Sequence, residues 1–168
     1  LDDKIDLLTR QNRTLEQLVE TYFRQWFVEE EVPMVKLGDV VKTTSGGTPS
    51  RDNSSYYENG IIHWIKSKEL NRSFIIDSEE KITESALENS AAKILPAKTI
   101  LVAMYGATVG EYAVLSIPAA CNQAVCAIMP NEAYPFTFLF SVLKNAREEF
   151  LNLAEGSAQQ NINQIVVK

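Results

Sequence analysis

The sequence predicts an α+β protein, in which a long N-terminal coiled-coil-type helix precedes a mixed or antiparallel β-rich globular domain with a few helices. Two observations support this fold class. Residues 1–28 repeat apolar side chains in steps of three and four, whereas the rest of the chain contains many short apolar segments separated by glycine, proline and polar residues. We therefore expect a dimerisation helix at residues 1–32 and a separate globular domain at residues 33–168.

The N-terminal helix is the clearest predicted element. Its segment has no glycine or proline before Pro33, and its apolar positions follow the heptad pattern of a coiled coil. Because such a helix is too long to be covered by a domain of this size, we expect it to pair with another helix; the alternative is an amphipathic helix lying on its own domain. Asn12 fits a pairing seam, since one buried polar residue fixes the register of two helices. The seam consists of Leu1, Ile5, Leu8, Asn12, Leu15, Val19, Tyr22 and Trp26.

The globular domain begins with alternating apolar residues, MVKLGDVV at 34–41, which predict a strand ending in the loop KTTSGGTPSR at 42–51. A helix or turn is expected from residue 85, and a longer helix from about Pro135 to Ala154, ending near Gly156. No strand–helix–strand rhythm and no internal repeat is visible. Further strands are predicted at 61–65, 73–77, 100–104, 111–117 and 119–130.

Composition sets broad limits on the class of protein. The hydrophobic fraction of 45% and the charged fraction of 23% are those of a globular protein, and no apolar run approaches the roughly 18 residues that span a bilayer. Because the chain begins at Leu1 without a methionine or a signal-like segment, we expect it to be a fragment of a longer protein.

The cysteines and the charge distribution limit the binding chemistry. Cys121 and Cys126 match no zinc-site spacing, and His63 alone cannot complete a metal site, so we expect buried reduced thiols in a cytoplasmic protein that binds no metal. The net charge of −6 argues against a plain electrostatic nucleic-acid binder. Residues 36–98 carry nine cations and nine anions, so an anion-binding surface must come from their local arrangement.

Tests for enzyme motifs favour a binding module. SGGTPS lacks the ending of a phosphate-binding P-loop, and its adjacent glycines do not make a dinucleotide-binding fingerprint. His63 lies between Ile62 and Trp64, which favours a strand position over a Ser–His–Asp site. Glu79 and Lys81 offer half of a metal-dependent nuclease motif, but no convincing aspartate precedes them.

Three polar segments are candidates for binding. HWIKSKELNR at 63–72 places cations and short polar side chains after an apolar strand, where they can contact phosphates and base edges; the alternative is a solvated turn. MYGATVGEYA at 104–113 is typical of a hairpin turn. AEGSAQQNINQ at 154–164 concentrates amides, which pair with adenine but also cap helices and bridge loops.

Taken together and in this order, these segments resemble one known family. Residues 1–29 resemble the central conserved helix of the DNA-specificity (S) subunit of type I restriction–modification enzymes. Each segment by itself is weakly specific, but their shared order covers nearly the whole chain. The segments that resemble the target recognition domain of that subunit are VKLGDVVKTTSGGTPS, YYENGIIHWIKSKEL, ITESALENSAAKILPAKTILVAMYGATVG, CNQAVCAIMP and EGSAQQNI.

The resemblance implies a non-catalytic role, with no cofactor in this chain. A family member normally has two target recognition domains, each followed by a long helix, and the two helices pair antiparallel as a spacer. Each domain reads one half of a split double-stranded DNA target in the major groove, while methyltransferase (M) and restriction/translocase (R) subunits supply the chemistry. With one helix and one domain, residues 33–168, this chain resembles a half-sized subunit or the second half of one. Its helix is then expected to pair with the second helix of the S subunit or with another copy.

The resemblance also implies which residues read DNA. GGTPS and YGATVG recur in members with different targets, so we assign them to loop geometry, with Gly46 and Gly47 supplying positive φ and Thr48–Pro49 stiffening the exit. Two alternatives stay open. The first is an assembly module that pairs through its helix and contacts DNA only in the full complex, and the second, which the sequence supports least, is a small nuclease. The candidates for base or backbone contact are Lys42, Thr44, Arg51, Asn53, Lys66, Ser67, Lys68, Asn71, Arg72 and Tyr105.

Overall fold

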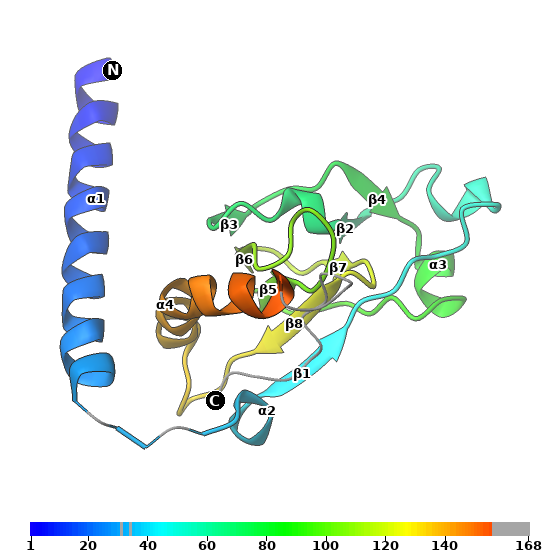
Figure 1. The fold of residues 1–168 in the computed structure, drawn as a ribbon. Helices are drawn as coiled ribbons and strands as arrows, with labels where there is room; N and C mark the ends of the chain where they lie inside the picture. The colour runs from blue at the N-terminus through cyan, green and yellow to red at the C-terminus, as the bar shows by residue number, and fades with distance from the viewer. Residues whose placement is uncertain (31, 34, 156–168) are drawn as a thin grey trace. The chain divides into compact units, whose positions relative to one another are not determined.

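The computed structural model describes residues 1–30, 32–33 and 35–155, with side chains described up to residue 148. The chain divides into two compact units, Leu1–Val35 and Lys36–Lys168. The predicted fold class is confirmed: a long N-terminal helix is followed by a mixed-sheet domain with further helices (Figure 1). None of the helices in the described part of the chain combines the length and the apolar character that crossing a bilayer requires.

The first unit is one long helix, α1 (Asp2–Arg24), continued by a π-helical turn at Gln25–Glu29. Its threonine hydroxyls donate to the carbonyl four residues earlier, as Thr9 does to Ile5 at 2.8 Å, so these residues are accommodated within the helix. All eight seam residues are exposed along it. The helix is confirmed, and its pairing with a second helix stays a prediction.

Two sheets form the second unit. The larger has the strand order β1 (Lys42–Ser45), β8 (Val125–Met129), β5 (Ile100–Ala103), β6 (Tyr112–Leu115) and β3 (Phe74–Ile75). The smaller has the order β4 (Glu80–Ile82), β2 (Ile62–Ile65) and β7 (Ala120–Cys121). The β3–β6 and β2–β7 pairs are parallel and the others antiparallel.

The larger sheet is buried on both faces. Alternate residues of β5 belong to different cores: Leu101 packs in the cluster shared with Ile65 of the smaller sheet, whereas Ile100 packs with Leu139 of α4 (Phe136–Glu155). Figure 1 shows α4 covering one face of this sheet. Burial on both sides explains why β5 is apolar throughout instead of alternating with polar residues. The helix predicted from about Pro135 is confirmed.

The smaller sheet has a core of its own on its outer face. Trp64 of β2 and Ile82 of β4 pack there against Ala86 of the short helix α3 (Glu84–Glu88). The hydroxyl of Thr83 caps α3 by accepting from the backbone N–H of Ala86 at 3.3 Å. This core fixes β2 and β4 side by side, which places the segments before and after them close together.

One strand prediction and one loop prediction were wrong at the edge of the larger sheet that β1 forms. The alternating segment 34–41 contains the short helix α2 (Leu37–Val40), and β1 begins at Lys42, inside the predicted loop. Leu37 and Val40, three residues apart, both pack against the core beneath α4, so one turn of helix buries the apolar residues that an alternating strand would separate. In so short a segment the apolar residues fit both the period of a strand and the period of a helix.

The segment 119–130 forms two strands, where the sequence predicts one. A turn at Asn122, closed by the 3.2 Å bond from the Val125 N–H to the Asn122 carbonyl, separates β7 in the smaller sheet from β8 in the larger. Strand β4 was not predicted, because its sequence, Glu-Lys-Ile, lies within a run of charged residues. It pairs with β2 and places Glu80 opposite Trp64.

Candidate nucleic-acid interface

Three of the predicted DNA-contacting residues lie together: Arg51, Lys66 and Lys68, hereafter the basic cluster. They come from three segments, the loop after β1, the end of β2 and the 3₁₀ turn Ser67–Glu69. Two carboxylates join them, Glu79 and Glu80, hereafter the acidic pair, which lie at the start of β4. Pairing of β2 with β4 brings these segments into contact, because it sets the acidic pair beside the end of β2.

Short ion pairs connect the acidic pair to the basic cluster. Glu80 Oε2 lies 2.7 Å from Arg51 Nη2, and Glu80 Oε1 lies 2.9 Å from Lys66 Nζ. Glu79 Oε2 lies 3.1 Å from Lys66 Nζ and 2.5 Å from Lys68 Nζ. These are the distances of charge-assisted hydrogen bonds, so in the described structure each of the three cations is paired with a carboxylate of the same chain.

Arg51 is held in a fixed orientation by aromatic rings. Its guanidinium carbon lies 4.3 Å from the ring centre of Tyr57 and 5.0 Å from that of Trp64. The Tyr57 hydroxyl donates to the Pro49 carbonyl at 2.6 Å, and the Trp64 indole N–H donates to the Gly47 carbonyl at 3.0 Å. The loop before Arg51 is thus tied to the same rings that orient its guanidinium.

Glu69 joins the two segments that carry the cations and the carboxylates. Its Oε1 accepts from the backbone N–H of Lys66, and its Oε2 accepts from the backbone N–H of Glu79, both at 2.9 Å. Because one carboxylate binds both backbones, the acidic pair is positioned by main-chain contacts as well as by its own side chains. The site therefore has a defined geometry in the free chain.

The ion pairs shift the pKa values of their members. Hydrogen bonds from Lys68 and Lys66 lower the pKa of Glu79. Burial raises the pKa of Glu80, but hydrogen bonds from Lys66 and Arg51 outweigh it and hold that pKa below its usual value. Burial lowers the pKa of Lys66, but its hydrogen bonds to Glu80 and Glu79 outweigh this and raise the pKa. Glu79, Glu80 and Lys66 are therefore ionised at neutral pH.

The double glycine before Arg51 serves close packing, and the predicted positive φ is wrong. Among the described glycines, positive φ is found at Gly106 and Gly110, not at Gly46 or Gly47. A Cβ on Gly46 would lie 2.2 Å from the Cys121 carbonyl oxygen. The N–H of Gly47 donates to that same carbonyl at 2.9 Å. Glycine is needed here because backbone passes directly over backbone.

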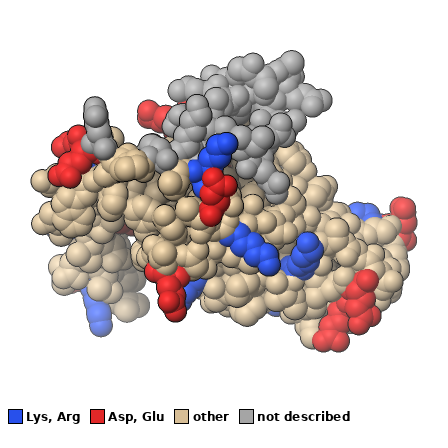
Figure 2. Space-filling model, turned by 90° about the horizontal axis from the view of Figure 1, so that it is seen from below, with Lys and Arg blue, Asp and Glu red and all other residues tan. Residues whose placement is uncertain are grey.

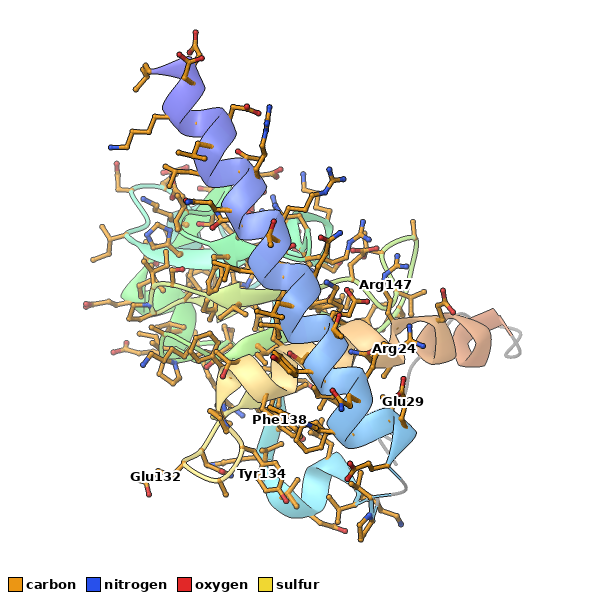
Figure 3. All side chains as sticks on the ribbon, turned by 90° about the vertical axis from the view of Figure 1, so that its left-hand side faces the viewer. Arg24, Glu29, Glu132, Tyr134, Phe138 and Arg147 are labelled. Carbon is orange, nitrogen blue, oxygen red and sulfur yellow. The ribbon has the colours of Figure 1, made fainter. Side chains whose placement is uncertain are left out.

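Arg72 lies in a different cluster. Its Nε is 3.1 Å from Glu111 Oε2, and Arg147 Nη2 on α4 is 2.7 Å from Glu111 Oε1. Figure 3 shows Arg147 farther along α4 than Phe138. Glu111 follows the hairpin loop between β5 and β6, where Gly106 and Gly110 adopt positive φ as the turn requires and where Tyr105 is exposed. Arg72 thus lies beside this hairpin, where its backbone N–H donates to the Tyr112 carbonyl at 2.7 Å, and Tyr105 lies within the hairpin loop.

The other predicted contact residues are not joined to either cluster by any described contact. Lys42 is exposed and pairs with Met129 at the far end of β1 from the glycine loop, and Thr44 is half-buried within that strand. Asn53 caps a 3₁₀ turn by accepting from the Ser55 N–H at 3.2 Å. Ser67 adjoins Lys68 in its turn, and Asn71 is an exposed neighbour of Arg72.

Sequence reasoning missed the carboxylates. Glu69, Glu79, Glu80 and Glu111 organise the predicted cations, yet the only sequence signal was the run Glu79–Lys81, which was weighed as half of a nuclease motif. On the face shown in Figure 2, basic and acidic side chains are interspersed among uncharged ones, without one continuous basic surface. A search limited to cations cannot find such paired sites.

Residues considered for catalysis have other surroundings. His63 lies in β2, as predicted, and its Nδ1 is 3.1 Å from Ser78 Oγ and 3.2 Å from Asp77 Oδ1. The cysteine thiols are free; Cys121 is buried, whereas Cys126, expected to be buried, is half-buried. Among the described residues, no group of three or more His, Cys, Asp or Glu could hold a metal ion. The amide-rich segment from Gly156 onward lies outside the described residues.

Comparison with known proteins supplies the family. Residues 29–168 match the model of the type I restriction modification DNA specificity domain. The chain belongs to this type I DNA-specificity family. The match confirms the expected family. Specificity subunits are non-catalytic.

Individual members of the family agree with this assignment. The chain is 31% identical over 77% of its length to the specificity subunit of the Escherichia coli type I restriction enzyme EcoR124I/EcoR124II, and 26% identical over 93% to that of the Methanocaldococcus jannaschii enzyme MjaIX. The S subunit from M. genitalium has the same fold over 93% of the chain, with a TM-score of 0.62 at 15% identity. The chain spans 33%, 41% and 40% of these proteins, respectively.

Proposed function

We propose that the domain from residue 33 onward is a target recognition domain that reads one half of a split DNA target. The observation that carries this proposal is the match of residues 29–168 to the DNA-specificity family. The basic cluster supports it, because it gathers a stacked guanidinium and two ammonium groups from separate segments. Arginine and lysine are the side chains that most often contact phosphates and guanine edges in the major groove.

The two clusters offer two parts of a contact surface. At the first, Arg51, Lys66 and Lys68 contact the DNA together with Ser67. At the second, Arg72 and Tyr105 contact it beside the β5–β6 hairpin, together with Asn71. Lys42, Thr44 and Asn53 stay in the proposal as contacts farther along the duplex. Phosphate contacts fix the register of the domain, and the contacts to base edges provide the sequence specificity.

The proposed role extends to an assembly. The net charge of −6 means that the chain alone holds DNA weakly and in a salt-sensitive manner. We propose that M subunits supply much of the phosphate contact and the methyl-transfer chemistry, and that an R subunit supplies translocation and cleavage, in the cytoplasm. Helix α1 pairs through its seam with the second helix of the S subunit or with another copy and thereby sets the distance between the half-sites.

The experiment that tests the DNA surface compares two double variants in the assembled methyltransferase. Arg51→Gln with Lys68→Gln removes two exposed cations of the basic cluster, and Lys36→Gln with Lys93→Gln removes two exposed cations elsewhere. We expect the first pair to weaken DNA binding by about tenfold or more and the control pair to change it little. Equal binding by both variants would show that the basic cluster does not face the DNA.

A second candidate function is an assembly module that contacts DNA only in the full complex. The exposed seam of α1 favours it, because seven large apolar or aromatic side chains along one helix are unusual on a surface that stays in contact with water. DNA binding by the chain alone at low salt separates the two functions. The small-nuclease alternative is disfavoured because Glu79 is engaged by Lys66 and Lys68; metal-dependent cleavage by the purified chain would restore it.

A further inference from the structure

The acidic pair is bound to the same side-chain donors of the basic cluster that a DNA phosphate would contact. Each carboxylate contacts two cations of the basic cluster, at 2.7 and 2.9 Å for Glu80 and at 3.1 and 2.5 Å for Glu79. A phosphate oxygen binds lysine and arginine through the same charge-assisted hydrogen bonds at the same distances. The two carboxylates therefore stand where the phosphate oxygens of a bound duplex would compete for these donors.

The backbone holds these carboxylates in place. Glu80 is the first residue of β4 and pairs with Trp64 of β2. The Glu79 N–H is bound by Glu69, and the Ser78 hydroxyl donates to the Glu80 carbonyl at 2.6 Å. An acidic side chain on a long flexible loop could move aside at little cost, but these two are attached to a sheet edge and to a main-chain bridge.

A solvated surface pair would have a different arrangement. Lys66 is the most enclosed cation of the cluster, with its side chain 15% exposed, and it is shared by both carboxylates. Contact with DNA requires Lys66 to exchange its two carboxylate partners for phosphate, or to keep them and bind the phosphate close to two negatively charged groups. Either outcome subtracts from the sequence-independent part of DNA binding.

We propose that Glu79 and Glu80 act as internal phosphate mimics, which weaken the attachment of the basic cluster to DNA of any sequence so that stable binding depends on contacts to the bases. This inference rests on the proposed function, because it concerns the same DNA surface. It assigns a specificity role to two acidic residues, through competition for the cations. Glu69 then acts as a positioning residue, which holds the acidic pair opposite the cations.

The test uses the full 168-residue chain and a fluorescent 30-base-pair duplex of random sequence, with binding followed by anisotropy between 25 and 200 mM KCl. Glu79→Gln with Glu80→Gln removes the competing charges while keeping side-chain size. Glu84→Gln with Glu88→Gln, both exposed on α3, removes the same charge outside the cluster. The single variant Glu79→Gln serves as the second probe, because Glu79 lies at the surface with its side chain 53% exposed and glutamine keeps the size of the side chain.

We expect the Glu79/Glu80 variant to bind about tenfold more tightly than the Glu84/Glu88 control at low salt, with a steeper dependence on salt because more cations release counterions. The Glu79→Gln variant should show a smaller change in the same direction. If both cluster variants bind no more tightly than the control, or more weakly than the unchanged chain, the acidic pair does not mimic phosphate and the inference is wrong.

A fourth variant separates this failure from failure of the proposed function. If Arg51→Gln with Lys68→Gln weakens binding while the Glu79/Glu80 variant fails to tighten it, the DNA surface stands and only the role of the acidic pair is overturned. If removing Arg51 and Lys68 leaves binding unchanged, or if no variant binds at 25 mM KCl, the DNA surface itself is wrong. The expected pattern is weaker binding without the cations and tighter binding without the carboxylates.

Discussion

The indole N–H of Trp64 donates to the carbonyl of Gly47 at 3.0 Å, and this bond ties strand β2 to the glycine loop. Trp64 is 2% exposed, so water cannot replace this hydrogen bond if it is lost. The same indole lies under the guanidinium of Arg51. One side chain therefore links the core of the smaller sheet, the path of the loop and the orientation of a proposed DNA-contacting residue.

Replacing Trp64 with Phe tests this link. We expect a loss of about 2 kcal/mol or more in the free energy of unfolding, because the Gly47 carbonyl loses its side-chain donor and the smaller ring leaves a gap. Urea unfolding followed by circular dichroism measures it. Tyr57→Phe is the comparison variant, since it also removes one donor, to the Pro49 carbonyl, but keeps the ring and so leaves no gap. Equal losses in both variants would contradict the special role of Trp64.

Adding a methyl group to the double glycine should destabilise the domain through steric overlap. Gly46→Ala places a Cβ 2.2 Å from the Cys121 oxygen, and Gly47→Ala places one 2.4 Å from the backbone of Ala91. We expect each change to lower the free energy of unfolding by about 3 kcal/mol or more. Gly38→Ala in α2 meets nothing within 4 Å and should be neutral or slightly stabilising. A neutral Gly46→Ala variant would show that the backbone contact is not required.

The network around Glu79 and Glu80 predicts a dependence of stability on acid. Their pKa values are lowered from 4.5 by their cation partners, so the network stabilises the fold above pH 4.5 and loses this contribution as the pH falls through the lower folded-state values. The stability difference between the unchanged chain and the Glu79/Glu80→Gln variant should shrink as the pH falls from 7 to 3. Urea midpoints measured across this range check it, and a constant difference would contradict the ion-pair origin.

The thiols should be protected in the folded chain. Burial raises the pKa of Cys121 to about 12, with a smaller contribution from nearby Cys126, and burial raises the pKa of Cys126 to about 11. At pH 8 we expect reaction with an aromatic disulfide reagent to be at least about a hundredfold slower in the folded chain than in urea. The Cys126→Ser variant leaves Cys121, the thiol expected to react more slowly, as the single thiol to be measured. Rapid reaction of Cys121 in buffer would contradict its burial.

The seam of α1 should control self-association if α1 pairs with another copy. Leu8→Lys with Leu15→Lys places charges on the seam, whereas Thr14→Lys with Gln17→Lys adds the same charge on the other side of the helix. Sedimentation velocity of the unchanged chain should show association that increases with concentration. We expect the first variant to abolish it and the second to retain it. A chain that stays monomeric at every concentration would contradict pairing with another copy.

The sequence by itself determined the elements whose side-chain pattern repeats over many residues. Helix α1 was predictable because its heptad pattern extends over almost thirty residues, and β2, β5 and α4 because their apolar segments are clearly bounded. The family was also predictable, because several weak motifs occur in one order and the match to the DNA-specificity domain confirms it.

Only the tertiary structure decided which charges meet. Arg51, Lys66 and Glu80 are separated by up to 29 residues and come together because β4 pairs with β2, and β4 was hidden within a charged run. The division of residues 119–130 between two sheets and the reason for Gly46 likewise depend on backbone segments distant in sequence. A local pattern records which face of an element is buried, but it carries no information about which distant segment lies against that face.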